Sequence, residues 1–483
     1  MTMQTVGSRA LKSAGWTAGA GWLSTAVSFA GNVALARLLV PADFGTLAVS
    51  LTILTFIFVP GSLSFNLAII QCRDEAVADV EDTAFGLSLL LGGALAVAGL
   101  AVAWLLEPIY GPEVRQIVSI LSLFRSANLL AYCYSATLER KLDYRPVAVT
   151  SILSLVGSYA VGIGLALAGL GVWALVGREM AVTAVSLVGL RISSGYRWRL
   201  HFNLDTMRWI WTFGWRMMLA RVGEILFGSF DNFAIGTLNS RAALGYYSQA
   251  YTLAMVGHRF TQTVIQSVTF STYAAVQNNP RLLKQGYEAV NFWLFRASVL
   301  LFVGTAAWGS SVVVLVYGDR WRNAGLLFQA MAFFLAALPL HENAKSLLIA
   351  SGHVESVMRI RLVQVACFLP LVWWQAAANG PFGVVWVVNG CLALSLGLML
   401  WKIHHLLRVD WQRLAGWPVV AGAVSALGAL VLEMALGSLA PILRLGIEVV
   451  VAIVLYVGLL LVLERKTLFS EIDQVWSRLA ERK

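Results

Sequence analysis

The residues that could do chemistry are the few charged side chains inside otherwise apolar segments of the chain. An unpaired charge at the centre of a bilayer costs about 2.5 to 3.5 kcal/mol on insertion scales, so each one needs a partner or a wet cavity. In segment 209–237, Arg221, Glu224 and Asp231 fall within one sector of a helix at about 100° per residue. This stripe predicts a cavity wall with a cation for a phosphate and carboxylates for a coupling ion. The alternative interpretation is an Arg221–Glu224 pair that ties the helix to a neighbour.

Two further segments carry polar stripes of the same kind. In segment 243–270, His258, Arg259 and Gln262 lie on one side of the expected helix. A histidine titrates near neutral pH, which makes His258 a candidate for ion coupling, although a hydrogen-bonded core histidine is the more common explanation. Segment 115–138 carries a similar stripe, formed by Arg125, Asn128 and Tyr132. The first apolar run contributes the polar residue Asn32, which fits close helix packing equally well.

A fourth cluster, Glu342 and Lys345, follows Pro339 and fits either cavity lining or structural pairing. Arg296 lies about eight residues from a helix end and is expected to reach the membrane interface. Arginine suits phosphate because its planar fork donates two parallel hydrogen bonds. The expected substrate-binding residues are Arg125, Arg221, Arg259, Asn128, Tyr132, Asn32 and Gln262. The expected ion-coupling residues are Glu224, Asp231, Glu342 and His258.

The composition requires a membrane around these residues. The chain has 483 residues, of which 59% are hydrophobic and 12% charged, with a mean hydropathy of +0.75. Ordinary globular domains carry roughly 25% charged residues, so this chain cannot cover a soluble surface. A cytosolic enzyme, a secreted disulfide scaffold and a nucleic-acid binder are excluded despite the net charge of +10. The four cysteines show no metal-ligand or disulfide spacing, and neither a metal nor a cofactor is expected.

The apolar runs predict an all-α polytopic membrane protein with about fourteen spanning helices. With the N-terminus inside, the even-numbered connections and both tails hold about 22 lysines and arginines, and the odd-numbered ones about 6. The distribution of positive charge therefore predicts the orientation of the chain, with both termini cytoplasmic. The expected spans are 15–38, 44–70, 83–106, 115–138, 147–169, 171–192, 209–237, 243–270, 288–316, 323–350, 357–378, 381–403, 416–437 and 443–463.

A comparison of the chain with itself at a shift of 200 residues reveals an internal repeat. The shift aligns Asn32 with Asn232 and Gly45 with Gly245, and both copies have a span, a tight break and a second span. Six spans separate the copies, which predicts a parallel repeat: two pseudo-symmetric six-helix lobes and two C-terminal helices. The expected parts are 1–208, 209–403, and 404–483 with a basic cytoplasmic tail.

Three motifs at these positions resemble a known family. Residues 36–48 (ARLLVPADFGTLA) resemble the first-loop signature of the polysaccharide-transport branch, the Wzx-type oligosaccharide flippases, of the multidrug/oligosaccharidyl-lipid/polysaccharide (MOP) exporter superfamily. Residues 136–145 (ATLERKLDYR) resemble that branch's loop after the fourth span, and residues 244–250 (LGYYSQA) resemble the second-lobe counterpart of the first motif.

The resemblance implies a flippase for lipid-linked oligosaccharide repeat units carried on undecaprenyl pyrophosphate. Such a protein moves these units to the periplasmic leaflet for exopolysaccharide, capsule or O-antigen synthesis. It also implies a bacterial inner membrane, and a pyrophosphate and glycan as the ligands of the expected substrate-binding residues. The two lobes predict alternating access, and because binding energy cannot drive net export, we expect a proton or sodium ion as coupling ion. The expected partners are membrane lipid, a polysaccharide polymerase and export machinery.

Two other functions stay open. A drug/cation antiporter of the same superfamily should have an acidic, aromatic cavity, whereas the arginines predict a basic one. An intramembrane polysaccharide polymerase or acyltransferase needs a catalytic constellation on a sizeable outer loop, and the longest expected outer loop has only about six to eight residues. No such constellation appears in the sequence, so we expect a transporter and not an enzyme.

Overall fold

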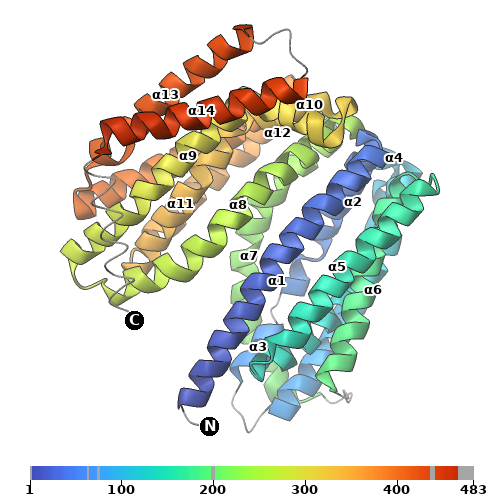
Figure 1. The fold of residues 1–483 in the computed structure, drawn as a ribbon. Coiled ribbons are helices and arrows are strands. Elements are labelled where there is room, and N and C mark those ends of the chain that lie inside the picture. Colours follow the sequence, from blue (N-terminus) through green and yellow to red (C-terminus); the bar gives the residue numbers. More distant parts are fainter. Residues whose placement is uncertain (1–2, 63–64, 73–76, 197–201, 436–440, 466–483) are drawn as a thin grey trace. The chain divides into compact units, whose positions relative to one another are not determined.

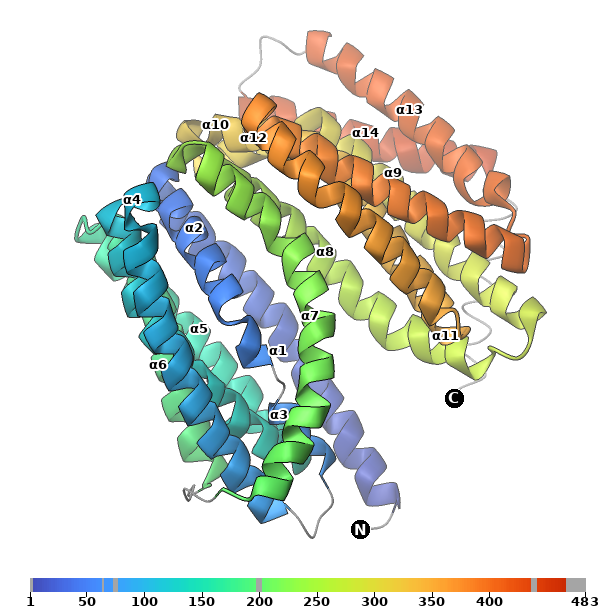
Figure 2. The same ribbon diagram turned by 180° about the vertical axis from the view of Figure 1, so that it is seen from behind.

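The computed structural model describes residues 3–62, 65–72, 77–196, 202–435 and 441–465. Within these ranges the chain forms α-helices joined by short turns and two 3-10 helices, without a strand (Figures 1 and 2). The expected all-α class is confirmed. The chain divides into two compact units, Met1–Ser248 and Gln249–Lys483, so the division falls inside a helix. The boundary at residue 208 that the repeat predicts stays a prediction.

The first unit is a bundle of long helices with one broken span. Helix α5 packs along α6 and α1, α6 packs along α4, and α7 packs against α2 and α4 (Figures 1 and 2). Its elements are α1 (Met3–Leu38), α2 (Pro41–Ile57), η1 (Val59–Ser62), α3 (Phe65–Gln71), α4 (Val77–Arg140), α5 (Tyr144–Leu167), α6 (Val172–Ser194), α7 (Leu204–Leu238) and the first turns of α8 (Arg241–Ala275).

The second unit is centred on α9, which packs against α10, α11, α13 and α14 (Figure 1). Helix α12 packs along α11. The elements are the rest of α8, α9 (Pro280–Tyr317), η3 (Asp319–Trp321), α10 (Arg322–Ala330), α11 (Ala332–Ala350), α12 (Val354–Leu407), α13 (Trp411–Ala435) and α14 (Pro441–Leu463).

Glycines divide the two longest helices. Gly111 in α4 and Gly380 in α12 have φ of 81° and 61°, and each is followed by a proline. Only glycine adopts this left-handed region without strain, so two helices meet at each break. By length and composition, seven of the described helices could cross a membrane, or nine if each of two bent pairs forms one span. The chain is a multi-pass membrane protein, and the total of fourteen spans stays a prediction.

The breaks of the repeat occur in the same register. Helices α1 and α7 end at Leu38 and Leu238, and α2 and α8 begin at Pro41 and Arg241. The shift of 200 residues therefore relates observed helix boundaries as well as residue types.

The connections of the first unit expected on the cytoplasmic side contact one another. The Arg140 guanidinium donates Nη1 hydrogen bonds to the carbonyl oxygens of Ile69 at 2.7 Å and Cys72 at 2.9 Å. These bonds satisfy carbonyls left open where α3 ends. The Tyr196 hydroxyl donates to the Asp82 carboxylate. Arg140 belongs to the 136–145 motif, so part of that motif is explained by helix capping.

A buried ion pair connects α9 to the end of α14. The side chains of Arg296 and Glu464 are 6% and 3% exposed, and Arg296 Nε lies 3.0 Å from Glu464 Oε2. The expectation that Arg296 reaches the interface is wrong. Glu464 supplies a buried counter-charge for the Arg296 guanidinium, so this side chain is neutralised without contact with water.

Replacement of Arg296 with alanine is expected to lower the free energy of unfolding by about 3 to 5 kcal/mol, because Glu464 would stay buried without a cation. Replacement of both residues, Arg296→Met with Glu464→Leu, should recover most of this loss. Thermal unfolding of the purified protein in detergent measures both effects. Equal destabilisation by the single and double variants would contradict this account of the pair.

Candidate substrate and ion site

The expected arginines lie at the middle of their helices. Arg221 is at the midpoint of the 35-residue helix α7, and Arg125 is midway between Gly111 and Arg140 in α4. Arg259 lies one residue past the middle of α8, and its side chain and that of Gln262 lie outside the described part of the structure. At 1.5 Å per residue, Arg221 is roughly 25 Å of helix from either end of α7.

Arg221 and Glu224 form a pair that points away from the rest of the first unit. Their side chains are 64% and 66% exposed, and Arg221 Nη1 lies 3.4 Å from Glu224 Oε2. The pair is therefore contained within α7, and it does not tie that helix to a neighbour in the described residues. Exposed charges at the middle of a membrane helix avoid hydrocarbon and favour a water-filled cavity.

Arg125 lies in a polar patch that α4 shares with α6. Its half-buried guanidinium forms no ion pair with a described residue, although Glu179 and Tyr132 are near enough to act on it electrostatically. Asn128 Nδ2 donates to Thr183 Oγ1 at 3.2 Å, and Tyr132 is exposed. The contribution of α6 was not predicted, because Thr183 gives no signal in an apolar segment.

Asp231 is the buried carboxylate of the polar stripe. Its exposure is 4%, and Oδ2 accepts a 2.7 Å hydrogen bond from the Tyr247 hydroxyl of α8. Within the described ranges it forms no ion pair. A dehydrated carboxylate without a counter-charge is unfavourable, so this site favours a proton or cation. Asn32, the repeat equivalent of the adjacent Asn232, is also buried.

Glu342 has a cationic neighbour, Lys345, and a histidine, His341, beside its carboxylate. Lys345 Nζ lies 2.7 Å from one carboxylate oxygen of Glu342, and His341 Nδ1 lies 3.5 Å from the other. His341 Nε2 is hydrogen-bonded to Ser395 Oγ at 2.9 Å. This arrangement corresponds to the structural pairing that the sequence left open. His258, the other ion candidate of the second unit, is buried.

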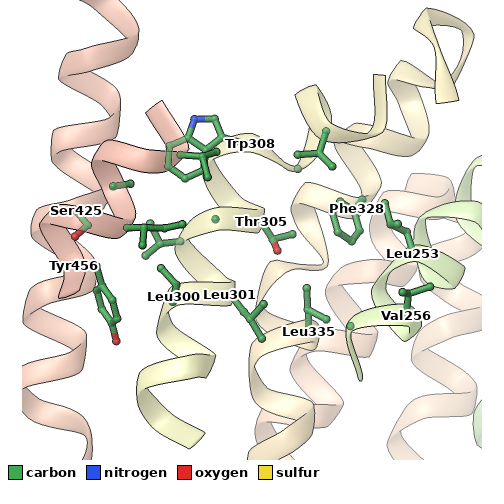
Figure 3. Close-up of a pocket in the computed structure, with 18 residues that line it drawn as sticks. Leu253, Val256, Leu300, Leu301, Thr305, Trp308, Phe328, Leu335, Ser425 and Tyr456 are labelled. Atoms are coloured by element: carbon green, nitrogen blue, oxygen red, sulfur yellow. The ribbon is translucent and has the colours of Figure 1, made fainter. Parts of the chain in front are cut away.

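The second unit contains an apolar cavity of about 400 Å³ between α9 and its neighbours (Figure 3). Its walls are aliphatic and aromatic side chains, with Thr305, Ser425 and Tyr456 as the labelled hydroxyl-bearing residues. The labelled apolar lining residues are Leu253, Val256, Leu300, Leu301, Trp308, Phe328 and Leu335. This cavity was not predicted, because the apolar periodicity of six separate helices does not indicate where their packing leaves space.

Two polar groups at the cavity, Trp308 Nε1 and the Tyr456 hydroxyl, are bonded to protein partners, whereas the buried Ser425 hydroxyl has none among the described residues. Glu448 accepts 2.8 Å hydrogen bonds from Trp308 Nε1 and Arg444 Nε. The Tyr456 hydroxyl donates to the Arg296 carbonyl oxygen at 2.9 Å. The walls therefore present apolar surface. The contact between Arg444 and Glu448 could have been predicted from their four-residue spacing on one helix.

Comparisons with known proteins agree with this architecture. The model of a family described as "Polysaccharide biosynthesis protein" matches residues 34–325. The succinoglycan biosynthesis transport protein ExoT of Rhizobium meliloti (strain 1021) is 22% identical over 450 residues, which cover 92% of this chain and 91% of that protein.

Two solved structures have a similar fold. The lipid II flippase MurJ in an inward closed conformation matches with a TM-score of 0.73 at 11% identity, covering 93% of this chain and 99% of that chain. An inward-facing multidrug resistance MATE family transporter of the MOP superfamily matches with a TM-score of 0.61 at 16% identity, covering 79% of this chain and 94% of that chain. The fold is therefore that of MOP superfamily transporters.

Proposed function

Because the chain belongs to the polysaccharide biosynthesis protein family, we propose that it is a flippase that moves lipid-linked oligosaccharide repeat units across the bacterial inner membrane. The expected relationship to the polysaccharide-transport branch is confirmed by the family match. ExoT, a full-length relative, is named as a transport protein of polysaccharide biosynthesis. We place both termini of this chain in the cytoplasm, as its basic residues predict.

The exposed arginine at the middle of α7 carries this proposal. A lipid-linked sugar unit presents a diphosphate at the point where the lipid meets the glycan. Arg221 and Arg125, which forms no ion pair with a described residue, offer guanidinium groups at mid-helix depth, where a diphosphate crossing the membrane would meet them. Arginine donates two parallel hydrogen bonds to phosphate, so these residues would bind the head group while Asn32, Asn128, Tyr132 and Gln262 contact diphosphate or sugar. Arg259 is the proposed third cation.

Transport proceeds by alternating access driven by an ion gradient. Binding of the head group cannot by itself drive net export, because the same site must also release it. Asp231 is the coupling group that the contacts favour, since Glu224 and Glu342 already have cationic neighbours. A proton or a sodium ion that occupies Asp231 would compensate the buried charge on one side and leave on the other.

The apolar cavity provides a place for part of the lipid chain during transport. Its walls lie among α8, α9, α10, α11, α13 and α14 and are almost entirely apolar, and Trp308 Nε1 and the Tyr456 hydroxyl are bonded to protein. Burial of apolar surface contributes about 25 cal/mol per Å², so a prenyl chain would bind there without any specific polar contact.

The substitution Gly304→Leu is expected to fill part of this cavity and weaken substrate binding. A Cβ at Gly304 would meet no atom within 4 Å, so the larger side chain fits without strain on the fold. We expect a higher KM for lipid-linked substrate with normal protein abundance. Gly446→Leu is the matched control, because Gly446 also has open space but does not line the cavity. An unchanged KM in the Gly304 variant would exclude the cavity from the transport path.

The antiporter alternative depends on an excess of acidic groups in the cavity. In the described part of the first unit, Glu224 is balanced by Arg221, and Arg125 has no ion pair. With Asp231 included, the two arginines balance the two carboxylates in formal charge, so the site has no excess of acidic groups to attract a cationic drug. Asp231 is buried while Arg221 is exposed, and this arrangement favours an anionic substrate.

Deletion of the gene tests the proposal in the native cell. We expect loss of a surface polysaccharide and accumulation of its lipid-linked repeat unit, with both reversed by the wild-type protein. Normal surface polysaccharide and no accumulation in the deletion strain would refute the proposal.

A further inference from the structure

Two equivalent turns of the repeat contact each other in the first unit. A Cβ added to Gly45 would overlap the carbonyl oxygen of Arg241, and a Cβ added to Gly245 would overlap the carbonyl oxygen of Pro41. The helices α2 and α8 therefore begin with their backbones in direct contact, as small residues permit in membranes.

This contact is reciprocal. The shift of 200 residues relates Gly45 to Gly245 and Pro41 to Arg241. The contact of Gly45 with Arg241 therefore has an equivalent in the contact of Gly245 with Pro41. Reciprocal contact between equivalent residues is the property of an isologous interface, in which a two-fold axis passes through the contact. A local two-fold axis therefore relates the α1–α2 turn to the α7–α8 turn.

Polar contacts join the bend of α4 to the same place. Arg241 Nη2 donates to the carbonyl oxygen of Tyr110, and its guanidinium lies 5.5 Å from the centre of the Tyr110 ring. The Tyr110 and Thr237 hydroxyls are 2.5 Å apart. The bend at Gly111 brings Tyr110 to this position. We call Gly45, Tyr110, Thr237, Arg241 and Gly245 the turn junction.

We propose that the turn junction is the outer gate of the transporter. This inference rests on the proposed function, because alternating access requires one end to seal while the other opens. The junction joins the first, third and seventh connections between expected spans, and all three fall on the periplasmic side of the expected topology. The close glycine contact forms the seal and lies on the local two-fold axis. Arg241 and Tyr110 hold it shut, and release of substrate to the outer leaflet requires their contact to break.

A cysteine placed at Gly228 reports on this gate. Gly228 is exposed, a Cβ there would meet no atom within 4 Å, and it lies about 15 Å of helix below Leu238. Intact cells carrying Gly228→Cys are treated with a membrane-impermeant maleimide, and mass spectrometry measures labelling of the peptide that contains position 228. The Gly228→Cys protein, which keeps its native cysteines, is the parent for the variants below.

Arg241→Ala in this parent is expected to raise the labelling rate about tenfold, which corresponds to about 1.4 kcal/mol in favour of the open state. Tyr110→Phe removes one hydroxyl and should raise the rate by a smaller factor. Arg115→Ala is the matched control, because Arg115 is on the same bend but pairs with Glu107 of α4 at 3.0 Å. It should label at the parental rate.

Parental labelling rates in the Tyr110→Phe variant and in every stably accumulating Arg241 variant would overturn the gate. An equal increase in the Arg115→Ala control would overturn it as well. Labelling requires no substrate, so this test is independent of the deletion experiment. If the deletion strain had normal surface polysaccharide but Arg241→Ala still raised the labelling rate, the gate would be supported and only the proposed substrate would be rejected.

Discussion

Replacement of both Arg125 and Arg221 with alanine is expected to abolish surface polysaccharide while the protein still accumulates in the membrane. Loss of one partner of a buried charged hydrogen bond costs about 2 kcal/mol or more. Two such losses, about 4 kcal/mol together, weaken binding of the diphosphate by roughly 700-fold, since each 1.4 kcal/mol is a factor of ten. The fold should tolerate the change because Arg221 is exposed and Arg125 forms no ion pair with a described residue. Quantitative glycan analysis and immunoblotting measure the two effects.

Lysine substitutions at the same positions refine this result. Lysine keeps the charge but not the planar fork, so Arg125→Lys and Arg221→Lys should retain part of the transport activity. Arg115→Ala removes an arginine from the bend of α4 outside the proposed site and should leave the polysaccharide unchanged. Wild-type polysaccharide in the double alanine variant at equal abundance would exclude arginine binding of the diphosphate.

Asp231→Asn is expected to reduce ion-driven transport by about 5- to 150-fold, the range of typical coupling free energies between sites. Asparagine has the shape of aspartate and still accepts the hydrogen bond from Tyr247, but it cannot take up a proton and binds cations weakly. The protein should therefore fold and bind substrate, yet fail to respond to an imposed gradient. Transport into vesicles with and without a proton or sodium gradient measures this difference.

Glu224→Gln provides the control for coupling through the other carboxylate of the stripe. Glu224 is paired with Arg221 and exposed, so we expect this variant to keep its gradient dependence. An Asp231→Asn protein that still accumulates substrate in response to a gradient would move the coupling site elsewhere. Loss of gradient dependence in the Glu224 variant alone would place it at Glu224.

The location of the helices could be predicted from the sequence because hydropathy is a property of each segment alone. The expected spans 209–237 and 243–270 lie within α7 and α8, and the expected spans 83–106 and 115–138 lie on either side of Gly111. The stripe of Arg221, Glu224 and Asp231 was equally accessible, because residues on one helix are related by its period. These features depend on local order along the chain.

Contacts between distant segments could not be predicted in this way. Arg296 and Glu464 are 168 residues apart, and Arg241 and Tyr110 are 131 apart, so their pairing depends on which helices are neighbours. The hydropathy of α9 gives no indication that Arg296 meets a buried carboxylate. The turn junction is an intermediate case. The repeat placed Gly45 and Gly245 at equivalent positions, and only the structure shows that they touch.

The leaflet that holds the lipid-linked repeat unit tests the central claim most directly. In spheroplasts depleted of the protein, an impermeant oxidant of glycans should leave the repeat units intact, because they stay in the inner leaflet. Renewed synthesis of the wild-type protein should make them reactive, and synthesis of the Arg125→Ala, Arg221→Ala variant should not. Repeat units that react equally with and without the protein would show that it does not move them across the membrane.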